Sequence, residues 1–324
     1  MTSPGDGRTG LVLGAGGVLG AAWLIGALRA FEEVTGFDPR TADRLLGTSA
    51  GSILVAALGA GVDTNGLLHH QFGIITEGAP QIDFDPDTDS GGKLPPWPKP
   101  GIGSRELLFK SWRHPRQVHP QVALYSVVPE GRGDLQPVGR LVDSVNEGEW
   151  SPHPSCWVVA VDYEEGRRTV FGRDGAPEAR LRDAVMASCA VPGWYHPVTI
   201  GGRRYVDGGV RSSTSAELLA KLDLDRVYVF APMASYELDQ PKSVGTAFER
   251  GVRRYVTRGL TAEVERLRAA GIAVEVFTPG PADLEVIGPN LMNPLRRTDV
   301  LETSLRTMTE RLEAAQYVDV DGRS

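Results

Sequence analysis

The chain has 324 residues, enough to bury a large core in one large domain or two small ones. Its net charge of −7 argues against a nucleic-acid binder, because such proteins usually carry a basic stripe. Two cysteines, Cys156 and Cys189, exclude a disulfide framework and are interpreted as small buried residues in a reducing compartment. The six histidines form no zinc pattern, so we expect no metal site.

The N-terminal run from Thr9 to Leu28 contains no charged residue and resembles a signal peptide or a membrane span in that respect. Five glycines crowd its first half and Asp6 precedes it, which argues against both interpretations. We predict instead a buried strand over 10–13, a glycine loop, and a core helix through Phe31. This interpretation favours a cytosolic protein.

Short apolar runs alternate with helix-like patterns along the rest of the chain. Strands are predicted at 10–13, 44–46, 157–162, 226–231 and 273–277. Helices are predicted at 19–34, 50–60, 181–188, 215–222, 244–270 and 298–316. Short antiparallel hairpins are expected at 167–171 and 198–206, the second turning at Gly201-Gly202. The alternation predicts an α/β fold with a mostly parallel sheet covered on both faces.

The segment 77–137 differs in composition from its surroundings. Six prolines between positions 80 and 100 oppose regular structure through its first third, and interspersed aspartates keep it hydrated. A stretch this long without regular structure is expected to be either a lid over a site or a mobile surface loop.

A serine stands at the centre of Gly47-Thr48-Ser49-Ala50-Gly51, between a predicted strand and a predicted helix. The spacing is that of a nucleophile elbow, in which small flanking residues allow strand and helix backbones to approach closely. At the start of a helix, free N–H groups and the helix dipole favour developing negative charge. The pattern alone is also compatible with an ordinary strand–helix corner.

The loop from Gly14 to Gly20 follows a strand and opens a helix, and two hypotheses compete for it. It fits a dinucleotide-binding loop, although Glu32 and Glu33 fall short of the usual distance to the ribose-binding acid. Alternatively, its backbone N–H groups stabilise a developing oxyanion. The loop by itself does not decide between them.

Asp207 ends a predicted strand and is followed by Gly208 and Gly209. Glycines there allow a sharp turn and let another loop approach the carboxylate. An aspartate in a tight turn also has a purely structural interpretation. Within hydrogen-bond reach of Ser49, however, this carboxylate can act as a general base, so the combination favours acyl-transfer chemistry.

The three motifs, in this order, resemble those of the patatin-like phospholipases of bacterial type, a family of acyl hydrolases with a Ser–Asp dyad. The segment 187–197 also resembles the family's pocket-lining segment before the aspartate, and the similarity covers about residues 8–231. The resemblance implies a three-layer fold with a mostly parallel central sheet flanked by helices on both faces. It implies a single domain over 1–324, with a lid-like insertion at about 77–137 and a C-terminal part at about 240–324.

The resemblance also implies the roles of individual residues. Ser49 would be the nucleophile and Asp207 the general base, with the N–H groups of Gly16, Gly17 and Val18 forming the oxyanion hole. The motif glycines that it places at the site are Gly14, Gly20, Gly47, Gly51, Gly208 and Gly209. The implied reaction is hydrolysis of a carboxylic ester of an acyl lipid through an acyl-enzyme, with no cofactor.

The chain departs from the family pattern at two positions. Ala15 stands where glycine is usual, a mild change if its φ is negative. Leu19 stands where a basic residue is usual, which removes a cation expected near the mouth of the site. Any role of that charge in holding an anionic headgroup is therefore in doubt.

Three alternatives remain open. A hydrolase with a full serine–acid–histidine triad would need His196, the last histidine, but Asp207 follows it, against the order of that fold. His196 is therefore interpreted as pocket wall. An NAD(P)-binding protein and a catalytically inactive binding module are the other two.

The expected partners are an acyl lipid or small ester and no nucleic acid. We expect a cytoplasmic protein with at most transient, peripheral membrane contact, because no lipid-anchor motif is present. Arg250, Arg253, Arg254 and Arg258 of the helix 244–270 are interpreted either as a solvated helix face or as a stripe facing headgroups. Neither the oligomeric state nor the acyl lipid follows from the sequence.

Overall fold

The computed structural model describes residues 7–74, 81–89, 94–241 and 243–321. Across these residues, eight strands form one sheet in the order β5–β6–β3–β2–β1–β7–β8, with β4 paired to β3 off this path. Their bounds are β1 Thr9–Leu13, β2 Arg44–Thr48, β3 Cys156–Asp162, β4 Arg168–Phe171, β5 Val198–Ile200, β6 Arg203–Asp207, β7 Arg226–Phe230 and β8 Ala273–Phe277. Strands β3, β2, β1, β7 and β8 run parallel, and β4, β5 and β6 form an antiparallel edge.

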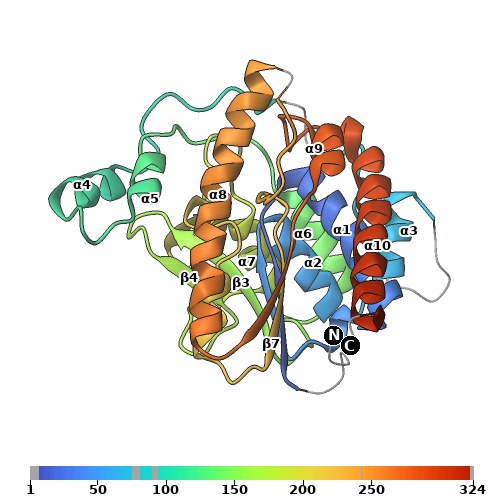
Figure 1. Cartoon of the computed structure of the whole chain (residues 1–324). Helices are drawn as coiled ribbons and strands as arrows, with labels where there is room; N and C mark the ends of the chain where they lie inside the picture. The colour runs from blue at the N-terminus through green and yellow to red at the C-terminus, as the bar shows by residue number, and fades with distance from the viewer. Residues whose placement is uncertain (1–6, 75–80, 90–93, 242, 322–324) are drawn as a thin grey trace.

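Helices cover both faces of this sheet (Figure 1). Their bounds are α1 Gly17–Thr35, α2 Ala50–Gly59, α3 Thr64–Gln71, α4 Arg105–Arg113, α5 Pro120–Tyr125, α6 Gln136–Val145, α7 Leu181–Ser188, α8 Val244–Ala269, α9 Pro281–Ile287 and α10 Arg297–Asp321. Leu11 and Leu13 of β1 pack with α1, α2 and α10, whereas Val12 points to the opposite face and packs with α8. This period-two alternation along buried strands produces the three layers.

Most of the predicted elements are present at the predicted places. The hairpin of β5 and β6 turns at Gly201 and Gly202, whose φ values of 56° and 77° are those that a tight hairpin turn needs. The helix predicted over 215–222 is instead a 3₁₀ helix over Ala216–Lys221. Cys156 and Cys189 are buried and free, as predicted.

The uncharged N-terminal run forms β1, the glycine loop and the first part of α1, all within the core. Among the described residues, no helix combines the length and the apolar character that crossing a bilayer requires.

The segment predicted to lack regular structure differs from that prediction over 105–125, where α4 and α5 form. The Ser104 side chain caps α4 by accepting a hydrogen bond from the Leu107 N–H at 3.1 Å. Leu107 and Val122 are fully buried in a cluster with Val161 of β3, and this tertiary contact favours helix despite the proline-rich surroundings. The start of the predicted insertion, and residues 90–93, lie outside the described residues.

Candidate active site

Ser49 occupies the turn between β2 and α2, with φ 52° and ψ −122°. This conformation is costly for any residue with a side chain and is typical of a nucleophile elbow. The two flanking glycines are required by space, because a Cβ at Gly51 would overlap the Leu13 carbonyl and one at Gly47 would overlap Val55 and the Gly51 carbonyl. The predicted elbow is therefore present in the backbone.

Asp207 lies beside Ser49 at the end of β6 and is 4% exposed. Its carboxylate accepts a hydrogen bond from the Gly209 N–H at 2.7 Å. Burial raises the pKa of Asp207 to about 6, and the neighbouring Ser49 side chain and Gly209 N–H act in the opposite direction. The carboxylate is thus placed to accept the proton of Ser49 and has a basicity suited to neutral pH.

The glycine loop before α1 is fixed at its first two residues and free at the next three. The Gly14 N–H donates to the Phe230 carbonyl at 2.9 Å, and the Ala15 N–H donates to the Ser213 carbonyl at 2.7 Å. Within the described part of the chain, the N–H groups at positions 16, 17 and 18 have no acceptor. Since these groups lie at a helix N-terminus, they can receive a negatively charged oxygen.

The conformation of the glycine loop explains how Ala15 and Leu19, the two residues that differ from the family pattern, are accommodated. Gly17 has φ 60°, which favours glycine, whereas Ala15 has no positive φ and fits without strain. Leu19 is fully buried in the core on α1. Its side chain therefore packs internally and does not reach the mouth of the site.

Glu263 of α8 holds the loop that supports the glycine loop. Its buried carboxylate accepts hydrogen bonds from the Ser212 hydroxyl, from the Thr214 hydroxyl at 2.6 Å and from the Ala216 N–H at 2.8 Å. Ser213, between these partners, supplies the carbonyl that binds the Ala15 N–H. A buried side chain of α8 thus positions the backbone of the glycine loop through the intervening segment 212–216.

Glu263 also contacts a second carboxylate, that of Glu217. Burial and the adjacent Glu217 raise the pKa of Glu263 to about 7. Burial acts to raise the pKa of Glu217 as well, but the hydrogen bond with Glu263 and the ion pair with Arg168 at 2.7 Å lower it. Burial and the repulsion between the two carboxylates therefore favour a proton shared within the pair.

A largely apolar pocket opens beside Ser49, between α1, α2, α3, α6 and the segment 82–89. Its apolar lining consists of Val18, Ala21, Ile25, Ala50, Ile53, Leu54, Ala57, Leu67, Ile82, Phe84, Pro86, Leu135, Val138, Leu141, Val191, Tyr195 and Met292. His70, Gln71, Asp89 and Arg297 add polar groups to the wall. Such a pocket suits a long hydrocarbon chain.

Two interpretations of single residues prove wrong. His196 is exposed and does not line the pocket; its neighbour Tyr195 does. Arg250 and Arg253 are each 1% exposed, so they form neither a solvated face nor a stripe toward headgroups. The sequence pattern placed them on α8 correctly but gave no sign of the partners that bury them.

The acidic residues required by the dinucleotide hypothesis lie in unsuitable places. The Glu32 carboxylate accepts a hydrogen bond from the Thr64 hydroxyl, and Glu33 forms an ion pair with Arg29 on the same helix. Both lie near the end of α1 rather than at the end of β2, where a ribose-binding acid belongs. Among the described residues, no group of three or more His, Cys, Asp or Glu side chains is arranged to hold a metal ion.

The family model for patatin-like phospholipases matches residues 11–220. Among solved structures, the chain is similar to VipD from Legionella pneumophila (TM-score 0.45, 13% identity, covering 95% of this chain and 67% of that one). It is also similar to the type III effector ExoU (TM-score 0.36, 14% identity, covering 96% and 54%). For ExoU in complex with SpcU from Pseudomonas aeruginosa, the TM-score is 0.32 at 17% identity, covering 97% and 60%. The chain spans about half to two thirds of these proteins, and comparison with curated proteins found no match.

Proposed function

The chain belongs to the patatin-like phospholipase family, whose members are lipid hydrolases, and we propose that it is a serine-dependent lipid acyl hydrolase. One observation carries the proposal. Ser49 lies in a strained turn at the start of α2, beside the buried carboxylate of Asp207 and facing an apolar pocket. Strained backbone at a pocket, beside a group with a perturbed pKa, is typical of a nucleophile and its base.

In the proposed reaction, Ser49 Oγ attacks the ester carbonyl carbon while Asp207 accepts the hydroxyl proton. Collapse of the tetrahedral intermediate breaks the bond to the alcohol, which takes the proton from Asp207 as it leaves. Water then loses a proton to Asp207 and attacks the acyl-enzyme. The fatty acid is released and Ser49 regains its proton.

The negative charge of each tetrahedral intermediate falls on the former carbonyl oxygen. The N–H groups of Gly16, Gly17 and Val18 are proposed to bind it, because they lack acceptors at a helix N-terminus next to the pocket. Donors of this kind contribute about 3 kcal/mol each in other acyl-transfer enzymes.

The acyl chain is proposed to occupy the pocket beneath the segment 82–89. Ile82, Phe84 and Pro86 alternate with exposed aspartates and turn toward the pocket. This alternation gives the segment an apolar inner surface and a hydrated outer one, as a cover over a hydrocarbon chain requires. We propose that this part of the insertion acts as the lid.

The test combines covalent labelling with turnover. A fluorophosphonate probe should modify wild-type protein at Ser49, and a short-chain nitrophenyl ester should be hydrolysed. Ser49→Ala should abolish both, and Asp207→Asn should lower turnover by roughly a hundredfold or more, because an amide cannot accept the proton. Ser111→Ala and Asp174→Asn, which change the same residue types away from the pocket, should match the wild type.

Two other results would replace the proposal. Wild-type turnover in both Ser49→Ala and Asp207→Asn would show that the dyad assignment is wrong. Thermal stabilisation by NAD(P) with no ester cleavage would favour the dinucleotide hypothesis. Lipid binding without labelling or turnover in the wild type would identify an inactive binding module.

A further inference from the structure

The first half of α8 presents apolar side chains to the outside. Val244 and Phe248 are 89% and 76% exposed, and Val252 and Tyr255 are 39% and 54% exposed. Their spacing of four, four and three residues places all four on one side of the helix. We name these four residues the outward face of α8. A helix packed on a globular core normally has the opposite polarity, and the described chain leaves most of this face uncovered.

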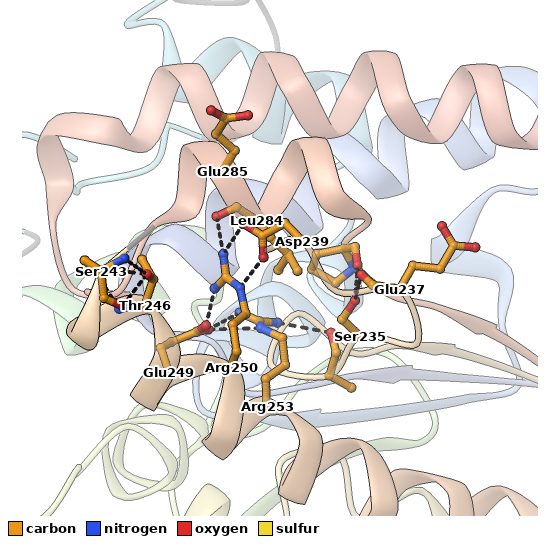
Figure 2. Close-up of polar contacts among 12 residues, drawn as sticks. Ser235, Glu237, Asp239, Ser243, Thr246, Glu249, Arg250, Arg253, Leu284 and Glu285 are labelled. Atoms are coloured by element: carbon orange, nitrogen blue, oxygen red, sulfur yellow. Dashed lines mark hydrogen bonds and ion pairs between the residues drawn. The ribbon is translucent and has the colours of Figure 1, made fainter. Parts of the chain in front are cut away.

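Three charged side chains of the same turns, those of Glu249, Arg250 and Arg253, point inward (Figure 2). Glu249 forms ion pairs with both Arg250 and Arg253. Arg253 Nη1 donates to the Pro232 carbonyl at 2.6 Å, and Arg250 Nη2 donates to the Leu284 carbonyl at 3.0 Å. Rotating α8 to bury its apolar residues would break all these contacts and leave buried carbonyls unpaired. The orientation of the outward face is therefore fixed by the fold.

A second exposed apolar pair lies on α4. Phe109 and Trp112 are 58% and 77% exposed, with ring centroids 6.3 Å apart. In Figure 1 helix α5 lies between α4 and α8, and the Tyr255 hydroxyl of the outward face donates to Gln121 Oε1 of α5 at 3.3 Å. The α4 pair is therefore separate from the outward face.

The first half of α8 adjoins segments of the candidate active site. Gly245, at the start of α8, lies against Pro289. Met292, three residues after Pro289 in the chain, lines the pocket. Arg253 of α8 binds the Pro232 carbonyl. The ring of the same proline packs against Gly16 of the glycine loop. The first turns of α8 therefore contact, through their inward side, segments that lead to the pocket.

The charges around the outward face indicate what covers it. Glu249 is the one acidic residue between Ser243 and Ala262, and it is turned inward. The exposed charges on this stretch are those of Arg254 and Arg258, although the whole chain carries −7. Exposed aromatic and aliphatic residues flanked by arginines suit the interface of an anionic bilayer, where aromatic rings lie at headgroup level.

We propose that the outward face of α8 docks the protein on an anionic lipid bilayer. The apolar side chains enter the interface, and Arg254 and Arg258 contact headgroups. The docking does not depend on the proposed hydrolase function.

The test measures binding to vesicles without turnover. Sedimentation uses full-length Ser49→Ala protein, so that lipid is not consumed, with vesicles of phosphatidylcholine containing about a third phosphatidylglycerol. Adding Val244→Ser and Phe248→Ser should lower the partition coefficient by about tenfold or more. Adding Ile74→Ser, a change of a half-exposed apolar residue three positions beyond the end of α3, should leave the partition coefficient unchanged. Arg254→Glu with Arg258→Glu should remove the preference for phosphatidylglycerol.

The outcomes separate the two proposals. Vesicle binding that depends on Phe248, in a wild type that cleaves no ester, supports docking and counts against the hydrolase. Ester cleavage by a wild type that does not bind vesicles, or whose binding ignores Val244 and Phe248, overturns docking alone. Concentration-dependent dimers in sedimentation velocity that Phe248→Ser abolishes would also overturn it, since a second copy would then cover the face. Melting temperatures confirm that each variant is folded.

Discussion

The backbone N–H of Ser49 donates to Ser188 Oγ at 2.8 Å, and the same hydroxyl donates to the Val159 carbonyl at 2.6 Å. One buried hydroxyl thus connects the elbow, the end of α7 and β3. The conformation of Ser49 costs about 1–3 kcal/mol and persists only where the surroundings hold it. Ser188 supplies one of these contacts, from 139 residues away in the sequence.

Replacing Ser188 should therefore affect both stability and turnover. Ser188→Ala leaves the Ser49 N–H and the Val159 carbonyl unpaired in the core, which should lower the free energy of unfolding by about 1–3 kcal/mol. It should also lower kcat for a nitrophenyl ester, because the elbow relaxes. The matched control is Ser304→Ala, a buried serine whose hydroxyl donates within its own helix to the Leu301 carbonyl. Equal losses in the two variants, measured by urea unfolding and ester hydrolysis, would contradict this role.

A pair of glycine substitutions separates close packing from helix propensity. Gly51→Ala inserts a methyl group into the Leu13 carbonyl and should destabilise the protein by several kcal/mol or prevent folding. Gly259→Ala, in the exposed middle of α8, meets nothing within 4 Å and should stabilise by about 0.5–1 kcal/mol. Urea unfolding measures both changes. A tolerated Gly51→Ala would mean that the strand and helix do not approach as closely as described.

The parts of the molecule that could be predicted from sequence are those fixed by neighbouring residues. The apolar run of β1, the glycines around Ser49 and the Gly201-Gly202 turn each depend on local backbone requirements, and the structure has them where they were predicted. Helix α4 was missed because Leu107 is buried by partners in β3 and β6, which the proline-rich sequence around it does not indicate. At this position the local sequence predicts no regular structure, but the burial of Leu107 against the sheet stabilises a helix.

The same reasoning explains what was missed around the candidate site. Ser188 and Glu263 hold the elbow and the glycine loop through contacts from distant positions, and neither stands in a motif with a characteristic spacing. Of the four arginines of α8 singled out in the sequence, Arg254 and Arg258 are exposed as expected, whereas inward ion pairs bury Arg250 and Arg253. His196 follows Tyr195 by one residue and points out where Tyr195 points in.

Turnover should rise with pH as Asp207 loses its proton. The proposed base must be ionised to accept the proton of Ser49, and burial raises its pKa to about 6. The value of kcat/KM for an uncharged soluble ester should therefore be low at pH 5, increase through pH 6 and level off by about pH 7. A pH–rate profile at constant ionic strength measures this. A profile that is flat from pH 5 to 7.5 would show that Asp207 is not the base.

The same carboxylate should cost stability at neutral pH. Its folded pKa lies above the ordinary value of 3.8, so the folded state binds more protons than the unfolded state between the two values. The contribution of Asp207 to stability therefore falls as pH rises from about 4 to about 6, by up to about 3 kcal/mol. Asp207→Asn should remove this loss and be at least as stable as wild type at pH 7.5, while nearly inactive. A variant that is inactive because it unfolds would contradict this account.

Substitutions of Glu263 should distinguish a proton-holding carboxyl group from a simple packing residue. Glu217 Oε2 is buried and accepts no other hydrogen bond among the described residues, which suits a proton donated by Glu263. Glu263→Gln keeps a donor for Glu217 and an acceptor for Thr214 and the Ala216 N–H, so it should retain ester turnover. Glu263→Ala should lower kcat by about tenfold, because the 212–216 loop then loses its acceptor and the Ser213 carbonyl no longer fixes Ala15.

The pH dependence of these variants provides the stricter test. The raised pKa of Glu263 stabilises the fold fully below its ordinary range near 4.5, and the contribution is lost as pH rises through about 7. The ionised group would then face Glu217, with Arg168, Arg211 and Arg266 as the surrounding cations. Wild type should thus lose stability between pH 6 and 8.5 in urea unfolding, and Glu263→Gln should lose less. If Glu263→Gln is as unstable and as inactive as Glu263→Ala at both pH 6 and pH 8.5, a proton on this carboxyl group does not stabilise the 212–216 loop.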